Sequence, residues 1–288
     1  MSAPGSAEAT RQAQPIDVHA EILGNTRLSD DYNILALRAP GIAERALPGQ
    51  FVMIKPAAGF DPLLRRPFSV FQVLRDDGGG RIGITVLNKR VGVGTGLLFE
   101  SRAGDRVDCL GPLGRPFVPV DPPAEAWLVA GGVGIAPFAT LADALRARGT
   151  PTTLFYGARR AGDLYCADEF ERLGVRLVCS TEDGSRGERG FVSVPLEQAL
   201  VARADTGTLQ IYACGPTPMM RAVAGLAARF NRPCAVSLEQ VMGCGMGGCY
   251  SCVVRVREGD APHFVRSCLA GPVFDARSVV WEELATGH

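Results

Sequence analysis

Four cysteines near the C-terminal end constrain this chain more than any other feature. They have the spacing C-x4-C-x2-C-x15-C and are Cys244, Cys249, Cys252 and Cys268. The same C-x4-C-x2-C…C spacing is found in plant-type [2Fe–2S] sites, where four thiolates hold the cluster. Glycines fill the gaps between the first cysteines, so the loop can adopt positive φ and pass close to a bound group. The sequence therefore predicts a [2Fe–2S] cluster on these four thiolates.

Two other interpretations of the cysteines are open. A structural zinc site usually pairs two C-x2-C hooks, whereas this segment has only one. Four buried structural cysteines are not expected to gather in a glycine-rich loop. The other cysteines are interpreted as small buried hydrophobes, with Cys214 left open. They are Cys109, Cys166, Cys179, Cys214 and Cys234.

Composition and the N-terminal segment favour a cytosolic protein. Residues 1–15 lack the basic start and apolar core of a signal peptide, and we expect them to form a disordered tail. No apolar run approaches the ~18 residues of a membrane span. Lys and Arg total 30 and so do Asp and Glu, a balance that argues against nucleic-acid binding. In the cytosol, nine cysteines favour metal binding over disulfides.

The hydrophobic pattern divides the remaining chain into three regions. In residues 16–121, short alternating runs such as RIGITVLNKR are separated by Gly and Pro, which predicts an antiparallel β-barrel. In residues 122–232, apolar strands such as AWLVAGG alternate with helical stretches, which predicts a doubly wound parallel α/β sheet. Residues 233–288 are rich in Gly and Cys and contain one short strand candidate, CVVRVREG. We therefore expect a multidomain fold, all-β plus α/β, with a small C-terminal [2Fe–2S] domain.

The first region carries residues suited to a flavin nucleotide. Arg66 begins the strand candidate RPFS, and an Arg beside a strand can hold a pyrophosphate with its fork of donors. Gly94 and Thr95 open a short predicted helix, whose free N–H groups favour a phosphate. Ser69 could hydrogen-bond the reactive edge of a flavin ring. RPFS alone is a weak motif, and an ordinary strand start is the alternative interpretation.

The second region carries residues suited to a nicotinamide nucleotide. A predicted strand leads into the glycine-rich turn GGVGIAP, which allows close backbone approach to a pyrophosphate at a helix N-terminus. The residues of this turn that we assign to the nucleotide are Gly131, Gly132, Gly134 and Pro137. The last strand of the region ends in Cys214, Gly215 and Pro216, on the side where such sheets bind ligands. Cys214 either faces the nicotinamide or is a buried strand-end residue. No His belongs to a motif, and no catalytic side chain is predicted.

In this order, the motifs resemble those of the ferredoxin–NADP reductase superfamily over residues 16–232. The C-terminal glycine–cysteine loop narrows the resemblance to the electron transfer subunits of class 1B dihydroorotate dehydrogenase. Further matches are PGQF at 48–51, GPLG at 111–114, TEDGSRGERGFV at 181–192 and TPMM at 217–220. Phe68 stands where this family often has Ile or Leu, and the cysteine loop reads GCGMGGC where ACGxGAC is commoner. Neither departure involves a cluster ligand.

The resemblance implies a set of cofactors and a partner. It implies that the four cysteines hold the cluster, and that electrons pass from dihydroorotate through FMN, the cluster and FAD to NAD+ in pyrimidine synthesis. The partner would be an FMN-containing catalytic subunit, in a heterotetramer of two plus two. The FAD residues implied are Arg66, Pro67, Phe68, Ser69, Leu87, Asn88, Lys89, Gly94 and Thr95.

Two rival functions and one question of specificity are open. A related subunit could exchange electrons between NAD(P)H and ferredoxin or sulfur compounds; the first cluster ligand in that group is often Asp, whereas here it is Cys244. A non-catalytic redox sensor would not need the nicotinamide motifs. Arg159 and Arg160 follow the second strand of the nucleotide region, where an Arg could meet the 2′-phosphate of NADP or simply be solvated.

Overall fold

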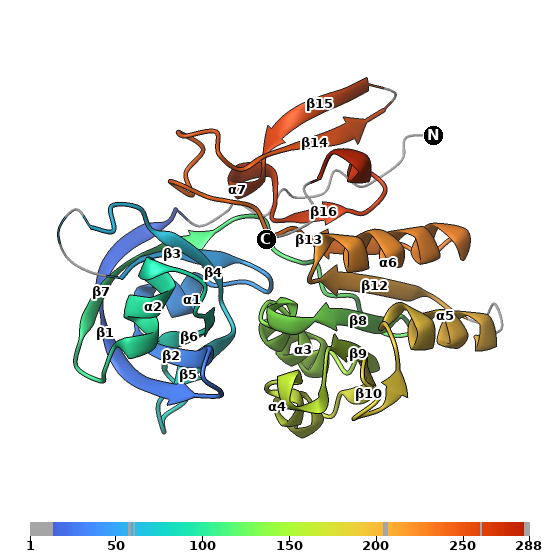
Figure 1. The fold of residues 1–288 in the computed structure, drawn as a ribbon, viewed down its shortest axis with the longest axis horizontal. Coiled ribbons are helices and arrows are strands. Elements are labelled where there is room, and N and C mark those ends of the chain that lie inside the picture. Colours follow the sequence, from blue (N-terminus) through green and yellow to red (C-terminus); the bar gives the residue numbers. More distant parts are fainter. Residues whose placement is uncertain (1–13, 57–58, 60, 204–206, 260, 285–288) are drawn as a thin grey trace, which may run out of the picture.

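The computed structural model describes residues 14–56, 59, 61–203, 207–259 and 261–284. Most of the predicted N-terminal tail lies outside these residues. Figure 1 shows a barrel-like sheet on one side, a layered α/β unit on the other, and a two-stranded hairpin beside both. The predicted fold class, an antiparallel barrel followed by a parallel α/β sheet and a small cluster region, is confirmed. No helix in the described residues has both the length and the apolar character of a membrane span.

The first sheet has seven strands in the order β4-β3-β7-β1-β2-β6-β5, all antiparallel. Its edge strands β4 and β5 are separated by only two residues, so the sheet curls round until its edges approach each other. Alternate residues such as Leu35 and Leu37 are buried inside, as the period-two pattern predicts. The elements are β1 (Ile16–Arg27), β2 (Tyr32–Arg38), α1 (Pro40–Arg45), β3 (Phe51–Lys55), β4 (Arg66–Ser69), β5 (Gln72–Arg75), β6 (Arg81–Lys89), α2 (Val93–Glu100) and β7 (Arg106–Leu113).

The second sheet has the order β11-β10-β9-β8-β12-β13-β16 and is parallel except for β16. The strand order reverses between β8 and β12, and ligand crevices in such sheets open there, at the carboxyl ends of the strands. The elements are β8 (Glu125–Gly131), η1 (Gly132–Ile135), α3 (Phe138–Ala147), β9 (Thr152–Ala158), η2 (Ala161–Asp163), α4 (Ala167–Arg172), β10 (Arg176–Thr181), β11 (Glu188–Arg189), α5 (Ser193–Ala202), β12 (Leu209–Cys214), α6 (Thr217–Arg229), β13 (Cys234–Ser237) and β16 (Val273–Asp275).

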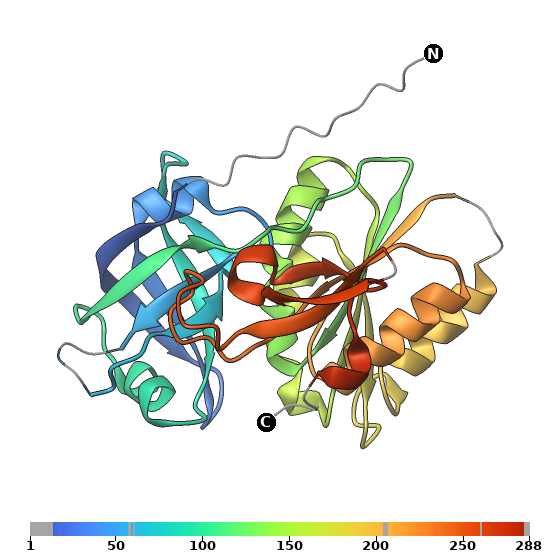
Figure 2. The ribbon, with the colours of Figure 1, turned by 90° about the horizontal axis from the view of Figure 1, so that it is seen from above.

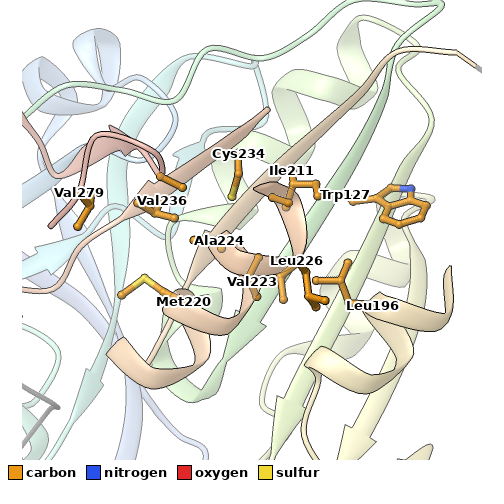
Figure 3. Packing of buried hydrophobic residues seen from close by; sticks show 14 of the residues in the cluster. Trp127, Leu196, Ile211, Met220, Val223, Ala224, Leu226, Cys234, Val236 and Val279 are labelled. Carbon is orange, nitrogen blue, oxygen red and sulfur yellow. The ribbon is translucent and has the colours of Figure 1, made fainter. Parts of the chain in front are cut away.

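Both faces of the parallel sheet are covered, which explains why its central strands are apolar throughout. One face packs against α5 and α6, where Trp127, Ile211 and Met220 belong to one buried cluster (Figure 3). The other face packs against α3 and α4. Phe117, from the segment that follows the barrel, contacts the rings of Phe138 and Tyr212 at 5.7 and 5.4 Å between centroids. This aromatic group joins the barrel side of the molecule to the parallel sheet.

The C-terminal region is fastened to the parallel sheet at two points. Its first strand, β13, extends that sheet, and β16 pairs antiparallel with β13. Between these strands lie an irregular loop, the hairpin and a short helix. Figure 2 shows this region crossing from the parallel sheet toward the barrel. Its elements are β14 (Val253–Glu258), β15 (Ala261–Arg266), α7 (Ser267–Ala270) and, after β16, η3 (Trp281–Glu283).

Candidate functional site

The four predicted cluster cysteines lie on one irregular loop and one short helix. We call residues 243–252 the cluster loop; it contains no helix or strand. Cys268 is in α7, and its N–H lies 3.5 Å from the sulfur of Cys252. Cys252 and Cys268 are buried, whereas Cys249 is exposed. All four thiols are free, so they are available as ligands.

The cysteines form two neighbouring pairs. Hydrogen bonding links Cys249 to Cys244, and Cys268 to Cys252. Among the described residues, no three or more His, Cys, Asp or Glu are placed to hold a metal ion as one centre. A two-iron cluster takes two ligands on each iron, and four cysteine thiols in two neighbouring pairs fit that donor set.

Local hydrogen bonds set the properties of Cys249, which is exposed, and of its half-buried neighbour Cys244. Ser251 lowers the pKa of Cys249 to about 6 through its side chain and backbone, and the Cys244 thiol adds to this effect. The N–H of Met246 lies 3.4 Å from the sulfur of Cys244. Burial raises the pKa of Cys268 to about 12, with a further contribution from Cys252. Donors therefore already point at sulfurs on the exposed side of the loop.

The cluster loop packs directly against the barrel. Gly245 has φ +73°, and a Cβ there would lie 2.5 Å from Cγ of Met53 on β3. Met53 belongs to a small buried cluster that also contains Cys252 and Cys268. On the other side, Arg266 donates a hydrogen bond of 2.7 Å to the carbonyl of Gly247. The loop is therefore held between β3 and the end of the hairpin.

The predicted nicotinamide residues lie at the reversal point of the parallel sheet. We call residues 131–137 the dinucleotide loop. A Cβ on Gly134 would lie 2.3 Å from the carbonyl oxygen of Cys214, and a Cβ on Gly215 would lie 3.0 Å from the N of Gly131. Pro137 precedes α3, and Pro216 precedes α6. The structure thus brings the two predicted segments into contact at the starts of two helices.

Three parts of the predicted flavin site, Arg66, Gly94 and residues 87–89, lie together near the start of α2, whereas Phe68 is buried in the barrel core. A Cβ on Gly94, in the first turn of α2, would lie 3.5 Å from Cγ and Nε of Arg66. Arg66 itself donates hydrogen bonds to the carbonyls of Leu64 and Arg65, at 3.0 and 3.2 Å. Residues 87–89 form the end of β6, beside the same helix. The guanidinium is therefore next to a helix N-terminus, the pairing that suits a pyrophosphate.

Two family models match the chain. One is described as an oxidoreductase NAD-binding domain and matches residues 128–225. The other is described as the iron–sulfur cluster binding domain of dihydroorotate dehydrogenase B and matches residues 239–280. These matches show that the chain contains an NAD-binding domain and an iron–sulfur cluster binding domain.

Whole-chain relatives decide the family. A protein of Desulforamulus reducens is 36% identical over 91% of this chain and 98% of its own length. One of Geobacillus kaustophilus is 41% identical over 85% of this chain and 91% of its own. Both are named dihydroorotate dehydrogenase B (NAD(+)), electron transfer subunit. The chain belongs to this family.

Solved structures agree with this family in fold. The structure of an NADH-dependent reduced ferredoxin-NADP oxidoreductase has a TM-score of 0.80 and 30% identity, covering 93% of this chain and 91% of that one. A ferredoxin NADP+ reductase from Neisseria gonorrhoeae has a TM-score of 0.61 at 18% identity, covering 76% and 92%, which supports the fold alone.

The chain also contains two residues that support the predicted flavin residue Asn88 and that the sequence did not reveal, Asn33 and Asn25. Asn88 on β6 donates to Oδ1 of Asn33 at 2.8 Å and to the carbonyl of Thr95 at 3.0 Å. Asn33 donates to Asn25 at 2.7 Å, and Asn25 donates to carbonyls at the end of α2. This row of amides fixes both ends of the helix next to Arg66. It depends on strand register, which no local motif indicates.

A further supporting residue is Tyr156 on β9. Its hydroxyl donates to the carbonyl of Gly132 at 3.3 Å, and burial raises its pKa, so the hydroxyl keeps its proton. Cys214 is also buried, and burial raises its pKa to about 12. Its thiol is therefore neutral at physiological pH. Tyr156 hydrogen-bonds to the dinucleotide loop, and the backbone of Cys214 packs against it at Gly134.

Proposed function

We propose that this chain is the electron transfer subunit of an NAD+-linked dihydroorotate dehydrogenase. It would relay electrons from the FMN of a catalytic subunit, by way of a [2Fe–2S] cluster and FAD, to NAD+ in de novo pyrimidine (UMP) biosynthesis. The observation that carries this proposal is the packing of the cluster loop on the barrel, through Gly245 and Met53. The same chain has a dinucleotide loop and belongs to this family.

The flavin residues are assigned by position. Arg66 and the first turn of α2 would bind the FAD pyrophosphate, with Leu87, Asn88 and Lys89 beside it. Ser69, at the far end of β4, would meet the ring with Pro67 and Phe68. FAD supplies hydride exchange with the nicotinamide and one-electron exchange with the cluster. The contribution assigned to the protein's own residues is to orient the two nucleotides.

The nicotinamide residues are assigned to NAD(H). The glycines of the dinucleotide loop leave space for a pyrophosphate against the N-terminus of α3. The segment of Cys214, Gly215 and Pro216 would border the nicotinamide, because it lies at the carboxyl end of β12. Arg159 and Arg160 are exposed at the end of β9, and Arg160 pairs with Asp163 at 3.2 Å.

The partner and the domain limits complete the proposal. A subunit named for electron transfer implies a catalytic partner; we propose an FMN-containing one, in a heterotetramer of two plus two. We propose a barrel domain at residues 16–121, a nucleotide domain at 122–232 and a cluster domain at 233–288. We also propose that the complex acts in the cytoplasm.

Anaerobic co-purification with an FMN-containing dihydroorotate dehydrogenase subunit tests this function. The assay is dihydroorotate-dependent reduction of NAD+ by each chain alone and by the mixture. Activity that needs both chains supports the proposal. A stable complex without this activity contradicts it.

A second candidate is a subunit that exchanges electrons between NAD(P)H and ferredoxin. The similarity to the ferredoxin-NADP oxidoreductase structure, at 30% identity, favours it. The Cys at position 244 favours the first proposal, as described above. If the purified chain reduces ferredoxin with NADH but does not bind the FMN subunit, the second candidate is correct.

A further inference from the structure

Ser251 lies inside the cluster loop, between the second and third cluster cysteines. Its hydroxyl oxygen is 3.0 Å from the sulfur of Cys249. The same oxygen is 2.9 Å from the backbone N of Gly243, at the start of the loop. Ser251 therefore contacts both a cluster ligand and the backbone that precedes Cys244.

The direction of these hydrogen bonds follows from the atoms involved. The N–H of Gly243 can only donate, so the Ser251 oxygen accepts from it. The single hydroxyl hydrogen of Ser251 then remains for its other close neighbour, the sulfur of Cys249. A cluster-bound Cys is a thiolate, which can only accept. The two hydrogen bonds therefore run in one direction. The Gly243 N–H donates to the Ser251 oxygen, and the Ser251 hydroxyl donates to the Cys249 sulfur.

We propose that Ser251 raises the reduction potential of the cluster by donating this hydrogen bond to the Cys249 sulfur. This inference rests on the proposed function, because it assumes a cluster on these four cysteines. Reduction adds one electron, breaks no bond and leaves the proton on Ser251. A donor to the ligand sulfur stabilises the added negative charge more than it stabilises the oxidised state. Ser251 is thus a positioning residue that acts through Cys249.

The location of Ser251 also limits the size of the effect. Ser251 is exposed, so water can replace part of a lost hydrogen bond. A typical net hydrogen-bond contribution corresponds to about a fivefold change in the one-electron equilibrium, or about 40 mV. We therefore expect Ser251→Ala to lower the midpoint potential by about this amount.

The test is an anaerobic redox titration followed by EPR on the full chain with its cluster. The variants are Ser251→Ala, the hydroxyl-retaining Ser251→Thr, and Ser251→Val, which has the shape of Thr without its hydroxyl. Ser278→Ala is the matched control, because the Ser278 hydroxyl donates to the carbonyl of Asp275 at 2.8 Å. Pulsed EPR of the wild-type protein in D2O gives a second measurement that needs no variant, since it detects an exchangeable deuteron near the cluster.

Each outcome separates the possibilities. A lower potential in the Ala and Val variants, with wild-type values in the Thr and Ser278→Ala variants, supports the inference. Equal midpoints in all variants overturn it, even if the Ala variant holds less cluster, because a purely structural role changes occupancy only. If Ser251→Ala does not retain a cluster, absence of a coupled deuteron in the wild type overturns it. Absence of any [2Fe–2S] signal in the wild type would instead contradict the proposed function.

Discussion

The dinucleotide loop and the cluster loop are both rich in glycine, but Gly134 of the first and Gly245 of the second have different neighbours. In the dinucleotide loop, a Cβ on Gly134 would meet the backbone carbonyl of Cys214. In the cluster loop, a Cβ on Gly245 would meet the side chain of Met53, and one on Gly247 the side chain of Leu269. Backbone cannot move without disturbing two strands, whereas a side chain can change rotamer. The first loop is therefore fixed by the sheet, and the second by side chains and by its cluster.

Loss of one cluster ligand should produce the largest difference between the two loops. We expect Cys249→Ser to abolish electron transfer to the partner while leaving flavin reduction by NADH close to the wild-type rate, because the dinucleotide loop does not depend on the cluster loop. Anaerobic stopped-flow absorbance measures both steps. Cys179→Ser, outside the loop, is the control. Equal loss of both steps would disprove this division of labour.

The next largest effect is expected from Gly134→Ala. Its Cβ would overlap the carbonyl oxygen of Cys214 at 2.3 Å, so the dinucleotide loop and the end of β12 must move apart. We expect the free energy of unfolding to fall by about 3 kcal/mol, a typical upper value for overpacking. We also expect the Kd for NADH to rise at least about tenfold, the equivalent of 1.4 kcal/mol. Chemical denaturation and fluorescence titration measure these changes.

Gly225→Ala is the matched control for this substitution. Gly225 lies within α6, and a Cβ there would meet nothing within 4 Å. This variant should be more stable by about 0.5 kcal/mol, because Ala is a better helix former than Gly. If Gly134→Ala and Gly225→Ala have the same stability, the close contact with the Cys214 carbonyl is not the reason that position 134 is a glycine.

Gly245→Ala should have a smaller effect, confined to the cluster. Positive φ costs a non-glycine residue about 1–2 kcal/mol, and the Met53 side chain must also move. We expect the cluster to be lost several-fold faster to a chelator, with no change in NADH affinity. Gly248→Ala is the control in the same loop, since its Cβ would meet nothing within 4 Å. Faster cluster loss in both variants would show that the loop does not depend on Gly245 in particular.

The smallest expected effect is on the reactivity of the Cys214 thiol, which can be measured on the unsubstituted protein. Burial raises its pKa to about 12, so the reactive thiolate is scarce until the pH approaches that value. Iodoacetamide should therefore leave Cys214 unmodified between about pH 7 and 9, where a free cysteine of pKa about 8.5 reacts. Mass spectrometry of folded and unfolded protein checks this. Rapid modification in the folded state would indicate that Cys214 opens onto the nucleotide crevice.

Local patterns predicted much of the fold and the clustering of the site residues. The cysteine spacing and the short helix beginning near Gly94 each depend on neighbours in the sequence, and the structure has the cluster loop and α2 at these places. Long-range contacts were not predictable in this way. The amide row from Asn88 through Asn33 needs the pairing of β2 with β6, and the contact of Gly245 with Met53 joins residues far apart in the chain.

The pairing of β13 with β16 has a consequence for how such a protein could have arisen. Ala235 is paired with Asp275, so the segment between these strands leaves and re-enters the sheet at neighbouring positions. An insertion whose ends are already adjacent adds little strain to its host. Residues 238–272 thus resemble an insertion between two paired strands, one that also adds Val254 and Val256 to the buried cluster beside α5 and α6. The same geometry would let a cluster be grafted onto an ancestor that lacked one.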